Sequence, residues 1–212
     1  PAPRLRRLSS TVMWFTILNN LEYKIVTSAT TFEIGFWNAW IFMSTFIFQM
    51  MFMMFAGKQI CKRSHVPSDA KRTTLEKYTG VIANFIWLIA LVYSIFLPLL
   101  FGTIWFYIGL FIFSLGLILL LISTINFMTT PVYQMIQKGV YKFSRHPMYL
   151  ATFLICLGSG IATASWIFIL LSIAILVCFH YEALLEERYC LEKYKDLYRG
   201  YMERVPMWIG IP

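Results

Sequence analysis

The segment YSIFLPLLFGTIWF, Tyr93 to Phe106, lies inside a run of 60 residues, Tyr78 to Gln137, that contains no Asp, Glu, Lys or Arg. A spanning helix needs only about 20 apolar residues, so this run is too long for one crossing. Pro98 lacks the amide hydrogen that a continuous helix needs, and Gly102 permits backbone conformations closed to other residues. The segment therefore predicts a hairpin of two membrane helices. Their expected bounds are Gly80–Leu97 and Thr103–Phe127.

The composition places the hairpin in an integral membrane protein. The 212 residues are 59% hydrophobic and only 13% charged, whereas soluble domains carry about a quarter charged residues. Backbone groups in hydrocarbon must be hydrogen-bonded internally, which long apolar runs achieve as helices. We therefore expect an all-α, polytopic membrane helix bundle of about five spans, the other three being Ile34–Phe55, Met148–Leu157 and Trp166–Tyr181.

Two further boundaries, one between the last two helices and one before the first span, are predicted from the local sequence. The small residues of Gly158–Ser165 are expected to separate the last two helices, the alternative being a helix that continues through the glycines. Before the first span, Ser10–Leu21 is apolar but too short to cross, which indicates an interfacial helix. We therefore expect an N-terminal interfacial segment, residues 1–33, followed by one membrane domain, residues 34–212.

The distribution of basic residues predicts the orientation. The formal net charge is +8, and with five crossings fourteen of the eighteen Lys and Arg residues lie on one side. The positive-inside rule makes that side cytoplasmic, together with the C-terminus. Cations in short loops between apolar runs suit anionic lipid headgroups, so membrane lipids and no nucleic acid are the expected partners. No CxxC, HxxH or HExxH pattern occurs, so no metal site is predicted.

Two polar clusters far apart in the sequence are expected to meet on the cytoplasmic face. Arg145 and His146 precede Pro147, which suits the first turn of a helix, and a helix start favours anions. In the tail, Glu186 and Glu187 follow the last span. Each cluster also has a simpler interpretation, as a headgroup anchor and as a solvated helix face. Tyr194, Tyr198 and Tyr201 are similarly expected to pack against the membrane interface.

The arrangement as a whole resembles the isoprenylcysteine carboxyl methyltransferases and the related phospholipid methyltransferase-like membrane proteins. The matching pieces are GVY and RHPMY within Gly139–Tyr149, and EERYCLEKYKDLYRGYMERVP at Glu186–Pro206. The resemblance implies a C-terminal catalytic core at about residues 126–212 and a cytoplasmic pocket for S-adenosylmethionine. The acceptor would be a lipid or a prenylated small molecule that enters from the bilayer.

The resemblance also implies roles for individual residues. Arg145 and Glu186 would be catalytic, with Arg145 holding an anionic acceptor and Glu186 orienting the cofactor. The residues expected at the cofactor are Tyr133, Gln134, Met135, Ile136, Tyr141, His146, Pro147, Met148, Tyr149, Glu186 and Glu187. Methyl transfer is an in-line displacement that needs no enzyme nucleophile, so the expected contribution of these residues is positioning and exclusion of water.

One departure from the family pattern concerns the acceptor. Isoprenylcysteine enzymes have an arginine about four residues before the glutamate that corresponds to Glu186, and this chain has Glu182 there. Glu182 is therefore a candidate substrate contact for a neutral or amine-bearing acceptor. Three functions stay open: an isoprenylcysteine carboxyl O-methyltransferase, a phospholipid N-methyltransferase, and a sterol-reductase-like enzyme that uses NADPH. A membrane protein without enzymatic activity is the further alternative.

Overall fold

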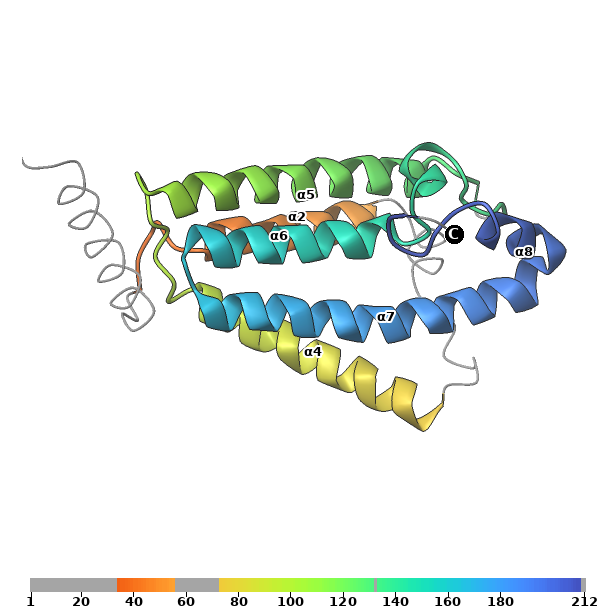
Figure 1. Ribbon diagram of the computed structural model, residues 1–212, viewed down its shortest axis with the longest axis horizontal. Coiled ribbons are helices and arrows are strands. Elements are labelled where there is room, and N and C mark those ends of the chain that lie inside the picture. Colours follow the sequence, from red (N-terminus) through yellow and green to blue (C-terminus); the bar gives the residue numbers. More distant parts are fainter. Residues whose placement is uncertain (1–33, 56–72, 132, 211–212) are drawn as a thin grey trace, which may run out of the picture.

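The computed structural model describes residues 34–55, 73–131 and 133–210, and every regular element within them is helical. The two short helices, η1 (Gly139–Lys142) and α8 (Asp196–Met202), lie at the same end of the bundle (Figure 1). The all-α prediction is confirmed, and the expected interfacial segment 1–33 lies outside the described residues. The five long helices run along the bundle as α2 (Trp40–Phe55), α4 (Thr74–Ser94), α5 (Ile104–Met128), α6 (Pro147–Ala162) and α7 (Trp166–Tyr194).

Length and hydropathy make this an integral membrane protein. Within the described residues, α4, α5 and α7 are long and apolar enough to cross a membrane, with 21, 25 and 29 residues. The apolar helices α2 and α6 have 16 residues each, about 24 Å at 1.5 Å per residue, against a hydrocarbon core of about 30 Å. The bundle therefore combines three full-length helices with two shorter ones.

The predicted hairpin forms between α4 and α5. Helix α4 ends at Ser94, α5 begins at Ile104, and Gly102 has the positive φ of 77° that the turn requires. The same turn sets the start of α2, because the Leu99 amide donates to the Trp37 carbonyl at 2.9 Å. This pairing and the isolated bridge between Asn38 and Pro98 tie the residues before α2 to the turn, and α2 begins at Trp40 and not at the predicted Ile34.

Helix α4 begins six residues before the predicted Gly80. Thr73 and Glu76 form a capping box, in which the Thr73 Oγ1 accepts from the Glu76 amide at 3.3 Å and Glu76 Oε2 accepts from the Thr73 amide at 2.7 Å. The box satisfies amides that would otherwise lack partners at a helix start. A polar first turn therefore precedes the apolar part of α4.

Helices α5 and α6 pack closely through glycines. A Cβ on Gly109 of α5 would lie 2.3 Å from the Ala162 amide nitrogen, and a Cβ on Gly158 of α6 would lie 2.5 Å from that of Phe113. Small residues allow such close approach between membrane helices. As predicted, the segment Gly158–Ser165 separates the last two helices, but α6 continues to Ala162 instead of ending at Leu157, and the chain turns at residues 163–165.

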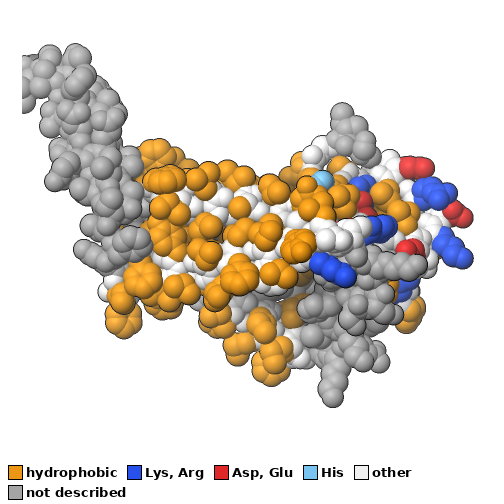
Figure 2. Space-filling view, turned by 90° about the horizontal axis from the view of Figure 1, so that it is seen from below, with side chains coloured by type: hydrophobic (Ala, Val, Ile, Leu, Met, Phe, Trp, Pro, Cys, Tyr) orange, Lys and Arg blue, Asp and Glu red, His pale blue; other side chains and the backbone are white. Residues whose placement is uncertain are grey.

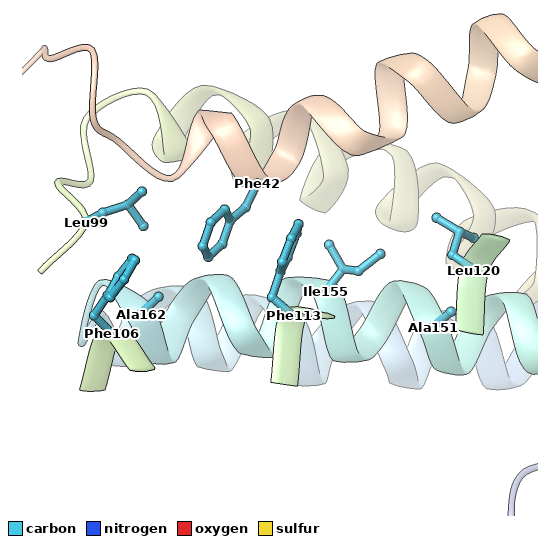
Figure 3. Close-up of a cluster of buried hydrophobic side chains, with 8 residues drawn as sticks. All are labelled: Phe42, Leu99, Phe106, Phe113, Leu120, Ala151, Ile155 and Ala162. Atoms are coloured by element: carbon cyan, nitrogen blue, oxygen red, sulfur yellow. The ribbon is translucent and has the colours of Figure 1, made fainter. Parts of the chain in front are cut away.

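One buried apolar cluster lies between α2, α5 and α6 (Figure 3), and a second one joins α2, α4, α6 and α7. The rings of Phe42 and Phe113 stack with centroids 4.1 Å apart, and Ile155 of α6 is completely buried beside them. The two rings cover the interface where α2 crosses the α5–α6 pair. Inside a membrane there is no hydrophobic driving force between helices, so close packing of this kind is what holds them together.

Helix α7 begins at Trp166, as predicted, and its start is capped by Ser165, whose Oγ accepts from the Phe168 amide at 3.3 Å. It ends at Tyr194, however, thirteen residues beyond the predicted Tyr181. The added turns are polar, and Arg188 within them forms an ion pair with Glu76 of α4. One continuous helix therefore connects the membrane bundle to the charged end.

Candidate active site

A cavity of about 230 Å³ lies at the charged end of the bundle. On the face seen in Figure 2, hydrophobic side chains cover the length of the bundle and charged side chains gather at one end. The cavity is formed by the loop after α5, the start of α6, the outer part of α7 and α8. Nine of the residues expected at the site line it: Met135, Ile136, Tyr141, Arg145, His146, Pro147, Met148, Tyr149 and Glu186.

The position of Glu186 along α7 gives the depth of the cavity. Glu186 lies 20 residues beyond Trp166, the first residue of α7, which is about 30 Å along the helix axis. This equals the approximate thickness of the hydrocarbon core. If Trp166 lies at one boundary of the membrane, Glu186 lies at the other, where a ligand from water can meet a ligand from lipid.

The start of α6 forms one wall of the cavity. Pro147 is the first helical residue, and its missing amide hydrogen costs nothing there. Met148 and Tyr149 follow in the first turn and line the cavity. The backbone hydrogen bond at the start of the helix runs from the Leu150 amide to the His146 carbonyl, at 3.2 Å. The first turn therefore presents the positive end of the helix dipole to this side of the cavity.

His146 lies between the two glutamates. Its Nε2 is 3.2 Å from Glu187 Oε1, and its Nδ1 is 3.4 Å from Glu186 Oε2. Burial alone lowers the pKa of His146, but the hydrogen bonds and negative charges of Glu186 and Glu187 outweigh it and raise the pKa above its ordinary 6.5. The imidazolium form is therefore favoured at this position.

Tyr149 connects this cluster to the membrane part of the bundle. Its hydroxyl donates to Glu186 Oε1, and its ring stacks between His146, at 5.7 Å, and Phe179 of α7, at 4.6 Å. The Glu186 side chain nevertheless stays 33% exposed. Glu186 is thus held by two partners while its carboxylate remains accessible from the cavity.

Arg145 is fixed by acceptors within the protein. Its Nε donates to Glu187 Oε1 at 2.7 Å, and its Nη1 donates to the carbonyls of Met202, at 3.1 Å, and Val205, at 2.7 Å. The side chains of Arg145 and Glu187 are only 9% and 6% exposed. The guanidinium therefore clamps α7 to the last residue of α8 and to the chain just after it, which differs from the expected role of holding an anionic acceptor.

Backbone bonds reinforce the clamp. The Arg145 amide donates to the Pro206 carbonyl at 3.0 Å, and the Met207 carbonyl accepts from both the His146 amide, at 3.3 Å, and the Ser144 hydroxyl, at 3.0 Å. We call residues 196–210 the C-terminal strap. The segment before α6 thus holds the strap across the end of the bundle.

The strap contributes cavity residues that the sequence reasoning did not place there. Lys195 has a φ of 49° between α7 and α8, so the chain turns and α8 brings Tyr198 and Tyr201 back to the cavity. These two side chains are 5% and 4% exposed, and the Tyr201 hydroxyl donates to the Tyr141 carbonyl at 2.6 Å. Burial raises the pKa of both phenols, which keeps them neutral.

The prediction that Tyr194, Tyr198 and Tyr201 pack against the membrane interface is therefore wrong, because all three line the cavity. The further lining residues that were missed are Phe127, Tyr189, Cys190 and Lys193. The available signal was the density of tyrosines in a charged segment. It could not be interpreted without knowledge of the turn at Lys195.

Four expected site residues do not line the cavity. Tyr133 is 78% exposed, and the Gln134 amide donates to the Pro131 carbonyl at 2.9 Å in the turn just before the lining residues Met135 and Ile136. Glu187 lies behind the lining, paired with Arg145 and His146. Glu182 lies one helical turn before Glu186 on α7, about 6 Å further into the bundle.

The lining suits the parts of S-adenosylmethionine. The cofactor combines a sulfonium cation, an amino acid end and an adenosine, and Glu186 lies among tyrosine rings that attract cations and stack on bases. The cavity is smaller than the about 300–1,000 Å³ of typical ligand pockets. A cofactor of this size would therefore fill it and extend beyond it.

The fold and the cavity define a class: an integral membrane helix bundle with a tyrosine-lined, charged pocket at one end of the bundle. Comparison with protein families is consistent with this class. Residues 98–196, somewhat less than half of the chain, match the family model described as phospholipid methyltransferase. The match covers the membrane methyltransferases that the sequence resembles and does not separate their types. No curated protein matches the chain.

Proposed function

We propose that this chain is an S-adenosylmethionine-dependent integral membrane methyltransferase with a lipophilic acceptor that enters from the bilayer. One observation carries the proposal: Glu186, a partly exposed carboxylate, lies in a tyrosine-lined cavity at the estimated depth of the membrane boundary. The family match of residues 98–196 supports the same chemistry. By the positive-inside rule, the pocket and the C-terminus face the cytoplasm.

The protein's contribution is positioning. When bound, S-adenosylmethionine would supply a methyl group on a sulfonium sulfur, and the acceptor atom would bond to that carbon in line with the departing sulfur. Glu186 attracts the positive charge, and Tyr149 and His146 hold Glu186 in place. Tyr198 and Tyr201 cover the cavity and exclude water. Alignment of two reactants supplies at most roughly 7 to 11 kcal/mol, and no side chain has to act as a nucleophile.

We infer that the acceptor is an amine on a lipid headgroup. A prenylcysteine carboxylate would need a cation near Glu186, where Arg145 already donates to Glu187 and to two carbonyls, and Lys193 lies two helical turns further along α7. The isoprenylcysteine pattern has an arginine where this chain has Glu182, which favours a cationic or neutral acceptor. The ammonium form of the headgroup would first lose a proton to water. Formation of the N–C bond would then break the bond between the methyl carbon and sulfur, giving the N-methylated lipid and S-adenosylhomocysteine.

A transfer assay tests the acceptor. The purified protein in lipid nanodiscs is given S-adenosylmethionine with a labelled methyl group, and either phosphatidylethanolamine or a farnesylcysteine analogue. Label in the phosphatidylethanolamine fraction is the expected result. Label in the farnesylcysteine analogue alone would establish the O-methyltransferase alternative.

Calorimetric titration tests the cofactor. We expect S-adenosylmethionine to bind and NADPH not to bind. Glu186→Gln is expected to weaken S-adenosylmethionine binding roughly tenfold, because it removes a charge-assisted contact worth about 1.5 kcal/mol. Lys142→Gln, on an exposed residue outside the cavity, is the control. Binding of NADPH alone would support the sterol-reductase-like alternative, and equal affinity of wild type and Glu186→Gln would remove Glu186 from the site.

A further inference from the structure

Lys193 is a cavity cation with no assigned role. It lies on α7 among the lining residues, and its ammonium is 5.8 Å from the ring centroid of Tyr189 and 5.1 Å from that of Tyr194. In the part of the chain that the structure describes, no carboxylate forms an ion pair with it. The two tyrosine rings hold the ammonium at the cavity without neutralising it.

The other basic groups of the lining are already engaged. The Arg145 guanidinium donates to Glu187 and to the strap, and the His146 imidazole lies between Glu186 and Glu187. An anionic group that enters the cavity therefore finds Lys193 as the available cation among these three. Glu186 is the accessible carboxylate of the lining, so among its side chains the cavity offers one cation without an ion-pair partner and one accessible carboxylate.

The two positions lie on one face of α7. Glu186 and Lys193 are seven residues apart, two helical turns, or about 10.5 Å between backbone positions along the axis. Helical side chains lean toward the N-terminus, and the Lys193 ammonium lies between Tyr189 of the preceding turn, at 5.8 Å, and the neighbouring Tyr194, at 5.1 Å. The charges are therefore ordered along the cavity, with the negative group at the membrane boundary and the positive group further out.

We propose that Lys193 binds the α-carboxylate of S-adenosylmethionine and thereby directs the sulfonium toward Glu186 and the membrane. This inference rests on the proposed function and adds the orientation of the cofactor. The carboxylate and the sulfonium of the cofactor are separated by a short carbon chain, so both can be held within one cavity. The methyl group is then presented where an acceptor from the bilayer arrives.

The same charge order does not fit the phosphate of a phospholipid headgroup. In a phospholipid at the bilayer surface, the phosphate lies nearer the acyl chains and the amine lies further out. Lys193 is the outer group and Glu186 the inner one, which is the reverse of the order such a headgroup needs. The anion expected at Lys193 therefore belongs to the ligand that enters from water.

Binding calorimetry on the purified full chain in nanodiscs tests this orientation with two ligands. The ligands are S-adenosylmethionine and its decarboxylated form, which keeps the sulfonium, the amine and the adenosine but lacks the carboxylate. Lys193→Met is expected to weaken S-adenosylmethionine binding roughly 2- to 5-fold, the effect of losing a charge pair at an exposed side chain. It is expected to leave the affinity for the decarboxylated form unchanged.

Lys142→Met is the matched control, because Lys142 is an exposed lysine outside the lining. It should alter neither affinity, and Lys193→Arg should restore most of the S-adenosylmethionine affinity. Equal loss for both ligands in Lys193→Met, or no loss for either, would overturn the assignment of Lys193. If the wild type binds both ligands equally, this inference fails and the proposed function stands. If the wild type binds neither, both fail.

Discussion

The substitution Arg145→Met tests whether Arg145 is a structural clamp or a residue that binds the acceptor. The substitution removes the bond from Nε to Glu187 and the two bonds from Nη1 to the strap carbonyls. It leaves the Glu187 carboxylate, with a side chain only 6% exposed, paired with His146 alone. Removal of one partner from a buried ion pair costs about 3 to 5 kcal/mol.

That loss should be visible in thermal unfolding. For a chain of this size, each kcal/mol lowers Tm by about 2 to 4 °C, so Arg145→Met is expected to lower Tm by roughly 6 to 20 °C. The measurement is unfolding of the purified protein in detergent micelles, together with hydrogen exchange of the strap, residues 196–210. Faster exchange in the strap is expected because its main anchor is lost.

Two further variants make the result specific. Lys142 is an exposed residue three positions before Arg145. Lys142→Met should therefore keep Tm within about 1 °C of the wild-type value, as surface substitutions usually do. The double variant Arg145→Met with Glu187→Met removes both charges and should lose less than the sum of the two single losses, by about 0.5 to 3 kcal/mol. An unchanged Tm and strap exchange in Arg145→Met, with weaker acceptor binding alone, would refute the clamp.

Two other predictions follow from the site and the bundle. The raised pKa of His146 means that its contribution to stability is complete below pH 6.5 and is lost as the pH rises through its folded pKa. His146→Gln should therefore flatten the dependence of Tm on pH above 6.5, and an unchanged slope would contradict the assignment. Gly158→Ala should destabilise by about 1 to 3 kcal/mol, because the new Cβ meets the Phe113 backbone. In the control Gly200→Ala, where nothing lies within 4 Å of the added Cβ, helix propensity should leave Tm equal or higher.

Local chemistry determined much of the fold. Apolar runs of sufficient length, interrupted at Pro98 and Gly102, predicted the α4–α5 hairpin. The expected bounds of α5, Thr103–Phe127, differ from the observed Ile104–Met128 by one residue at each end. Proline and glycine act on the backbone of their own turn, so their effect can be predicted without knowledge of the neighbouring helices.

Helix ends set by distant contacts were predicted less well. The start of α2 depends on its pairing with the α4–α5 turn, about 60 residues later. The glycine at position 158 is typical of a helix end, but here its missing side chain lets α5 and α6 approach inside the membrane. The same residue type serves both purposes, and only the position of the neighbouring helix decides between them.

For the candidate site too, one part could be predicted from the sequence and another depended on the tertiary structure. The sequence by itself determined that the segment Arg145–Tyr149 and the Glu186 region lie at the same end of the bundle, because the membrane fixes which loops share a side. Only the tertiary structure decided that Arg145 is a clamp, that Lys195 turns the chain, and that tyrosines of α8 complete the cavity. These features depend on hydrogen bonds and packing between residues 40 to 60 positions apart, which no local pattern encodes.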